Sequence, residues 1–209
     1  TSNNTDTPYV HNVRNATTTT LTSNNNPSIY GQNVTFTSTT TSAAAGTITG
    51  SVSFYNGATL LGTDNTIVGG VADFSINSLV VGTHPITAVY SGGGIFATST
   101  SASLDQVVDK ATLTVTADNQ TITYGDADPI FTFTYSGFVL GDDAADVDTA
   151  PTCDAPTPHV DAGTYPGIIV CSGGLDNNYT FNYVNGNLTV DPKALTITAD
   201  NQGKAFNTL

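Results

Sequence analysis

Several residue types are absent or rare in this chain of 209 residues. It has no Glu, Met or Trp, and its four basic residues stand against 17 acidic ones. The resulting net charge of −13 repels phosphate and anionic lipid. The chain also lacks any run of about 18 apolar residues, the length that a membrane-spanning helix needs. We therefore expect no nucleic-acid partner and no membrane insertion.

Cysteine is almost absent as well. Cys153 and Cys171 are too few, and too widely spaced, for a zinc site made of cysteine alone. The simpler interpretation is a disulfide, which would stabilise the fold by roughly 3 kcal/mol and implies export to an oxidising compartment. The chain begins at Thr1 without a Met, which indicates a mature or excised piece. We expect an extracellular or cell-surface location.

What the chain has in abundance is Thr, Ser, Asn and Gly, a composition typical of β-sheet proteins. Short stretches of alternating apolar and polar residues predict strands over 17–23, 33–40, 50–55, 58–63, 71–76, 83–90 and 99–107. Asn-Pro, Asn-Gly and Gly-Gly turn signals separate them, as in an antiparallel sandwich. The side chains expected to face inward are Val52, Phe54, Phe74, Ile76, Ile86, Ala88 and Tyr90.

Three segments in this region occur in a specific order: TITGSVSFYNGATLLGT, then GVADFSINSLVVGTHPITAVYSGG, then STSASLDQVV. In this order they resemble a bacterial Ig-like repeat domain, and the resemblance covers residues 17–109. Many members have an Asp after the Tyr-Ser-Gly of the second segment, where this chain has Gly93. That departure weakens any metal role carried over from the family.

A different set of segments fills residues 110–192. ADNQTITYGDADP, YSGFVLGD, DAGTYPGIIVCSGG and NYTFNYVNGNLTV resemble the MBG-type domain found in tandem on bacterial extracellular proteins. The cysteine pair is not part of that family's pattern, and here it would join the loop 149–158 to the strand containing 168–171. Asn185-Gly186 predicts a two-residue hairpin. Because residues 141–147 suit either a helical turn or a loop, the unit is either a β-sandwich or a β-grasp-like sheet.

The densest group of carboxylates is a weak candidate for calcium, which prefers oxygen ligands. The ligand order of an EF-hand is absent, and the spacing favours a solvated acidic loop over a metal site. The three His are scattered, and no nucleophile elbow or phosphate-binding loop occurs. We predict no cofactor, no catalytic residue and no enzyme activity. The candidate calcium ligands are Asp142, Asp143, Asp146 and Asp148.

The end of the chain repeats an earlier segment. KALTITADNQ at 193–202 matches KATLTVTADNQ at 110–120 with one residue deleted. Residues 193–209 are therefore predicted to begin a further repeat, as a strand without its own sheet. Its expected contact residues are Leu195, Ile197 and Ala199 on one face, with Phe206 beyond them.

Together these patterns predict an all-β chain with an N-terminal arm (1–16), an Ig-like domain (17–109), an MBG-type domain (110–192) and a donor strand (193–209). An exposed strand with an apolar face needs a partner. We expect a structural subunit of a cell-surface stalk or filament that assembles head to tail by strand addition, with copies of itself or neighbouring repeat domains as partners. The alternatives are a fragment of a large multidomain surface adhesin and a module that binds surface glycans.

Overall fold

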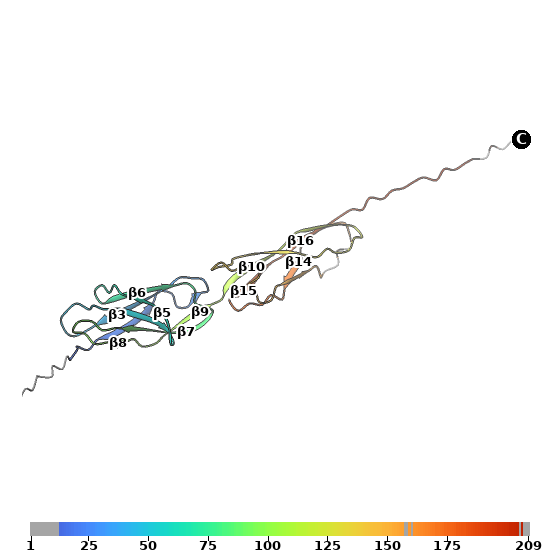
Figure 1. Cartoon of the computed structure of the whole chain (residues 1–209). Helices are drawn as coiled ribbons and strands as arrows, with labels where there is room; N and C mark the ends of the chain where they lie inside the picture. Colours follow the sequence, from blue (N-terminus) through green and yellow to red (C-terminus); the bar gives the residue numbers. More distant parts are fainter. Residues whose placement is uncertain (1–12, 157–158, 160, 205, 207–209) are drawn as a thin grey trace, which may run out of the picture. The chain divides into compact units, whose positions relative to one another are not determined.

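The structure is a computed structural model that describes residues 13–156, 159, 161–204 and 206 (Figure 1). Its regular elements are all β-strands, and the described residues contain no helix long and apolar enough to cross a membrane. The chain divides into two compact units. The first comprises residues up to Thr112 together with Phe138–Asp146 and Asp176–Thr180, and the second comprises the rest.

Two sheets make up the first unit. One has the order β1-β3-β6 and the other the order β2-β9-β7-β4-β5, with β8 paired to β7. All pairs are antiparallel except β2 with β9. The strands are β1 (Thr18–Ser23), β2 (Ser28–Ile29), β3 (Val34–Thr41), β4 (Val52–Asn56), β5 (Thr59–Asp64), β6 (Val71–Ile76), β7 (Gly82–Tyr90), β8 (Ser99–Thr100) and β9 (Leu104–Asp109).

The core of this unit follows the alternation of the sequence. Alternate side chains are buried along most of β3, β4 and β7, because neighbouring residues of a strand point to opposite faces of the sheet. Of the side chains expected to face inward, those on β4 and β7 are fully buried, whereas Phe74 and Ile76 on β6 are only partly buried. The Phe74 ring stacks on Phe54 at 5.6 Å between ring centres. Gly62 lies against that ring, where a Cβ would clash.

One predicted strand is in fact two. Residues 99–107 form β8 and β9, separated by Ser101 and its neighbours, and the prediction of one continuous strand was wrong. The reason lies in Ser101, whose buried Oγ accepts a hydrogen bond from the Ala88 amide at 3.0 Å and donates one to the Ala102 carbonyl at 2.8 Å. A side chain thus takes over the bond that a continuous strand would make.

The second unit is also built from two sheets, with orders β12-β10-β15 and β11-β16-β14-β13. Strands β10 and β15 begin at its boundary with the first unit. β11 runs parallel to β16, while β13, β14 and β16 are antiparallel. The strands are β10 (Ala111–Ala117), β11 (Gln120–Thr123), β12 (Phe133–Ser136), β13 (Thr152–Asp154), β14 (Gly163–Ser172), β15 (Tyr179–Val184) and β16 (Gly186–Asp191).

A single hydrophobic core lies between these sheets, with members from β10, β14 and β16. Residues 141–147 contain turns and no helix. Of the two folds left open by the sequence, the structure therefore has the sandwich. The buried core residues are Val115, Ala117, Ile169, Cys171, Leu188 and Val190.

The predicted hairpin at Asn185-Gly186 was wrong. β15 and β16 belong to different sheets, so this dipeptide connects one sheet to the other. Gly186 does not adopt the positive φ that a type I′ turn requires. It is buried against the backbone of β10, where a Cβ would come within 2.9 Å of the carbonyl oxygens of Ala117 and Asp118. The glycine serves the close approach of two chain segments and not a tight turn.

A buried amide holds the loop between β1 and β2 to β9. Gln106 is fully buried, and its Oε1 accepts a hydrogen bond from Ser23 Oγ at 2.7 Å. Its Nε2 donates to the Asn25 carbonyl at 2.8 Å and to Ser28 Oγ at 3.2 Å. With a further bond from Nε2 to the Val107 carbonyl at 3.0 Å, one side chain satisfies polar groups of four other residues inside the sandwich.

Gln106→Leu should destabilise the first unit by about 1–3 kcal/mol, because it keeps the volume but leaves those polar groups without a partner. The measurement is the urea midpoint of the purified chain. Gln202→Leu, at an exposed position, is the matched control and should change the free energy of unfolding by less than about 0.5 kcal/mol. Equal midpoints for the two variants would contradict the assignment.

Candidate functional site

The segment after β16 is exposed along its described length. Residues 192–204 have no regular secondary structure, and every one of them faces solvent. Leu195 is 84% exposed and Ile197 85% exposed, and Ala199 and Phe206 are also exposed. All four predicted contact residues are therefore exposed to solvent in the single chain.

The same sequence has a different environment earlier in the chain. Leu113 and Val115 of β10, the counterparts of Leu195 and Ile197, are both 0% exposed, and Ala117 is buried as well. β10 lies in the middle of its sheet and pairs with β12 on one side and β15 on the other. Nearly identical residues are thus core in one copy and surface in the other. The difference comes from neighbouring strands, which β10 has and residues 193–202 lack within the described chain.

The acidic loop predicted as a weak calcium candidate contains ordinary turn hydrogen bonds. Asp143 Oδ1 accepts from the Ala145 amide at 2.7 Å, and Asp146 Oδ2 accepts from the Asp143 amide at 2.8 Å. Asp142 points instead to two tyrosines. Across the described residues, no group of three or more His, Cys, Asp or Glu side chains comes together to hold a metal ion. The Asp142–Asp148 segment thus behaves as a turn whose carboxylates are engaged by the chain itself.

Asp142 belongs to an aromatic cluster that lies entirely in the first unit. Its Oδ2 accepts hydrogen bonds from Tyr179 Oη at 2.7 Å and from Tyr30 Oη at 3.2 Å. The Tyr179 ring packs edge to face against Tyr30 and against Phe138, with ring centres 5.7 Å apart in each pair. We refer to Tyr30, Phe138, Asp142 and Tyr179 as the tyrosine cluster. It joins residues from three separate parts of the sequence.

Beside the tyrosine cluster lies a glycine in close contact with Val139, and within the cluster the pKa of Tyr179 is shifted. Gly31 has a φ of 82°, and a Cβ there would lie 2.6 Å from Val139 Cγ2. Burial and, to a lesser degree, the Asp142 carboxylate raise the pKa of Tyr179 to about 12, although the hydrogen bond from the Val139 amide acts in the opposite direction. No sequence motif predicts this cluster, because its members lie in three separate parts of the chain and only the fold brings them together.

Two described histidines and one lysine, Lys110, have partners within the chain. His84 is buried. Its Nδ1 lies 2.9 Å from Asn56 Nδ2, and its Nε2 lies 2.8 Å from the Val80 carbonyl oxygen. His159 Nε2 lies 2.5 Å from Asp128. Lys110 Nζ donates to the Asp176 carbonyl at 2.7 Å. His11 lies outside the described residues.

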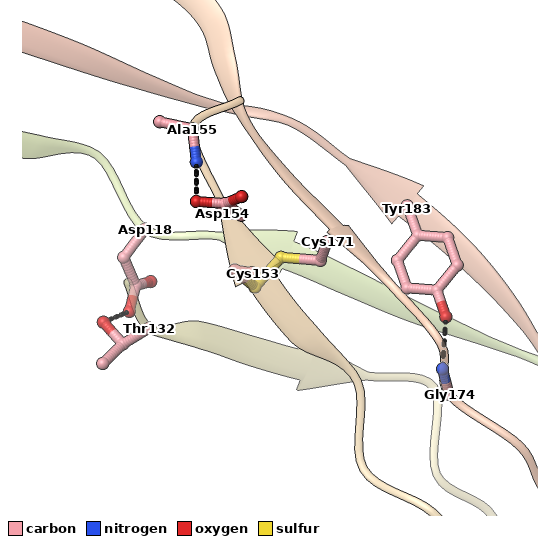
Figure 2. Close-up of a disulfide and its surroundings, with 8 residues drawn as sticks. All are labelled: Asp118, Thr132, Cys153, Asp154, Ala155, Cys171, Gly174 and Tyr183. Atoms are coloured by element: carbon pink, nitrogen blue, oxygen red, sulfur yellow. Dashed lines mark hydrogen bonds between the residues drawn. A yellow bond between two sulfur atoms is a disulfide. The ribbon is translucent and has the colours of Figure 1, made fainter. Parts of the chain in front are cut away.

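Cys153 and Cys171 are joined by a disulfide (Figure 2). They sit directly opposite each other on β13 and β14, with Cα atoms 4.0 Å apart. β13 has three residues and lies at the edge of its sheet, so few backbone hydrogen bonds hold it. The disulfide fastens this short edge strand to the core, since Cys171 is itself a core residue. Close by, the Thr132 hydroxyl donates to Asp118 at 2.7 Å (Figure 2).

Comparisons with known proteins place both halves of the chain in families of all-β repeat domains. Residues 21–109 match the bacterial Ig-like domain, group 3. Residues 113–189 match the MBG domain of the YGX type. The chain therefore carries a bacterial Ig-like domain followed by an MBG domain, in the order that the sequence segments indicated.

No curated protein matches the chain at a significant level. Among solved structures, the fibronectin(III)-like modules of CbhA from Clostridium thermocellum align with 87% of this chain and 100% of their own. The alignment has 18% sequence identity and a TM-score of 0.33, a similarity too low to carry an argument about function.

Tyr179→Phe should lower the free energy of unfolding at neutral pH by about 1–2 kcal/mol, because the Val139 amide and Asp142 lose a partner. The native pKa of Tyr179 lies above the ordinary value near 10, so its contribution is complete below pH 10 and is lost as the pH rises from 10 to about 12. The difference in unfolding free energy between wild type and variant, measured by urea titration, should therefore become smaller over that pH range. Tyr124→Phe, at an exposed tyrosine, is the control. A gap that stayed constant with pH would count against the cluster.

The two copies of the repeated segment give a paired test. Leu113→Ala should cost about 2–5 kcal/mol, because it leaves a cavity in a packed core. Leu195→Ala should change the stability of the dilute chain by less than about 0.5 kcal/mol. Thermal unfolding of both variants at low concentration measures the difference. Similar losses would show that Leu195 is buried within the single chain.

Proposed function

We propose that this chain is a structural part of an extracellular stalk or filament and that it joins to its neighbour by strand addition through residues 193–209. The observation that supports the proposal is the contrast between Leu195 and Ile197, which are exposed, and Leu113 and Val115, which are fully buried in the same sequence context. A strand of this composition has a stable position inside a sheet. The most direct way to complete it is a sheet on another domain.

The physics of strand edges favours this assembly. An extended segment gains main-chain hydrogen bonds by pairing with a free sheet edge, while its alternate side chains enter the partner's core. Left exposed, such a segment is a site of aggregation. Because the donor segment and a sheet edge are different surfaces, their contact is head to tail, and repetition of a head-to-tail contact gives an open fibre unless the rotation closes a ring.

The families and the disulfide are consistent with this setting. Bacterial Ig-like and MBG repeat domains are typical of surface or multidomain proteins. A disulfide persists in oxidising compartments, including the cell surface. The high density of Asp gives a net charge of −13, which keeps such a surface soluble and repels contacts other than those with basic segments.

A second candidate follows from the same repetition. In a longer adhesin-like polypeptide, residues 193–202 would be the first strand of another MBG domain, as 110–120 are of the one described. The segment would then be completed within its own chain. Mass spectrometry of the native polypeptide separates the two, since a species near 21.5 kDa supports strand addition between subunits and a much larger one supports a longer array.

Deletion of residues 193–209 tests strand addition. The 209-residue chain should form concentration-dependent chains of subunits, seen by light scattering and negative-stain electron microscopy, and the deleted chain should remain monomeric. The paired substitution Leu195→Asp with Ile197→Asp should have the same effect, because it places charge on the face that must be buried. Thr196→Ala with Thr198→Ala changes the opposite face and should leave assembly intact.

Monomers of the full chain at all accessible concentrations, or unchanged assemblies after the deletion, would rule the proposal out. Since residues 192–204 and Phe206 are exposed, the deletion removes no core side chain from the part of this segment that the structure describes. A far-ultraviolet circular dichroism spectrum and an unfolding midpoint that both match those of the full chain would show that the shortened chain stays folded.

A further inference from the structure

The second unit has an open groove between the ends of its two sheets. Among the strands that the structure describes, β12 pairs with β10 alone and β13 with β14 alone, so each is the last strand of its sheet. The groove lies where these two edges face each other and has a volume of about 400 Å³. It is lined by Asp128, Pro129, Ile130, Phe131, Phe133, Pro151, Thr152, Cys153 and Asp154.

We propose that this groove, called here the edge groove, receives residues 193–204 of a second copy of the chain. The inference rests on the proposed strand addition and specifies its acceptor, which the repeat by itself leaves open. It rests on three features of the edge groove: its apolar lining, the short terminal strands that flank it and its charge.

The lining of the edge groove is largely apolar, and part of it is uncovered. Ile130 is 90% exposed, and Phe131 and Phe133 beside it are only partly buried. The segment 193–204 has the complementary feature, since Leu195 and Ile197 project from one face of an extended chain without cover. Seating those side chains against Ile130 and Phe131 would remove apolar surface from water on both copies, which favours the contact.

The edges that flank the groove suit an added strand. β12 has four residues and β13 has three, and among the described strands each is the last of its sheet. Short edges protect a protein from indiscriminate pairing, yet they can accept a strand whose side chains also fit the adjacent pocket. The disulfide between Cys153 and Cys171 keeps β13 in place as one wall of the groove.

Charge selects this occupant over other parts of the same chain. The groove is bordered by Asp154 and by Asp128, whose carboxylate also contacts His159, on a protein whose net charge is −13. Residues 193–204 contain Lys193 and Lys204 against a single Asp200, which gives the segment a net charge of +1. Two of the four basic residues of the whole chain lie in this one segment. The groove thus repels most of a second copy and attracts residues 193–204.

Cross-linking of two variants tests the contact directly. A chain with Ile130→Cys is mixed with a chain with Ile197→Cys, and the mixture is oxidised under native conditions. We expect a disulfide-linked heterodimer in which mass spectrometry identifies a bond between positions 130 and 197. Leu60→Cys is the matched control, because Leu60 is an exposed apolar residue on β5 of the first unit. Cross-linking no greater than with this control would overturn the proposal.

A second measurement separates the groove from strand addition in general. Ile130→Asp should weaken assembly of the full chain by at least about tenfold and should leave its unfolding midpoint unchanged, because the residue is exposed. Leu60→Asp should assemble like wild type. If the Ile130→Asp chain assembles normally while the chain without residues 193–209 does not, the edge groove is not the acceptor, but strand addition is still supported. If the unaltered chain does not assemble, both fail.

A glycan is the other ligand that could occupy the edge groove, and binding measurements distinguish it from residues 193–204. Saturable binding of a glycan by the full chain, abolished by Ile130→Asp and unaffected by Leu195→Asp with Ile197→Asp, would assign the groove to that ligand and overturn the proposal. Competition by a synthetic peptide of residues 193–204, blocking assembly of the full chain, supports it.

Discussion

A β-strand is stable only where its backbone groups pair with a neighbour and its apolar face is covered, and most features of this protein follow from that requirement. Leu113 and Val115 meet both conditions because β10 lies between β12 and β15. Leu195 and Ile197 have the same alternation and meet neither, so the segment remains extended and exposed. The contrast isolates the contribution of tertiary neighbours, since the local sequence is nearly the same in both places.

The same requirement explains how the protein treats its sheet edges. Two edge strands of the second unit, β12 and β13, are short, and β13 is held by a disulfide in place of a long ladder of hydrogen bonds. Inside the first unit, Ser101 and Gln106 supply side-chain partners where the backbone ladder is interrupted. Polar side chains thus complete the pairing that strands alone leave unfinished, and a buried amide or hydroxyl without its partner would cost more than the bond is worth.

Family matches and compact units divide the chain differently. The MBG match runs over residues 113–189, but Phe138–Asp146 and Asp176–Thr180 belong to the first compact unit. The tyrosine cluster gives a physical reason, since Tyr30 of the Ig-like sequence shares a carboxylate with Tyr179 of the MBG sequence. Repetition in sequence follows the order of strands, whereas compactness follows burial, and the two need not change at the same residue.

Alternation and turn residues were enough to predict the all-β class and most strands of the first unit, because the period of two is a local property. The two families were indicated separately, by the resemblance of whole segments to known repeat domains. They also identified Cys153 and Cys171 and the repeated segment at 193–202. Sequence reasoning was wrong at Asn185-Gly186 and at residues 99–107, where a close backbone approach and the Ser101 hydroxyl override the local pattern. It gave no signal for the tyrosine cluster or the edge groove, whose residues lie far apart in the chain. Local pattern determines which residues of a strand face the same way, and only the packing of distant strands decides which of those faces is covered.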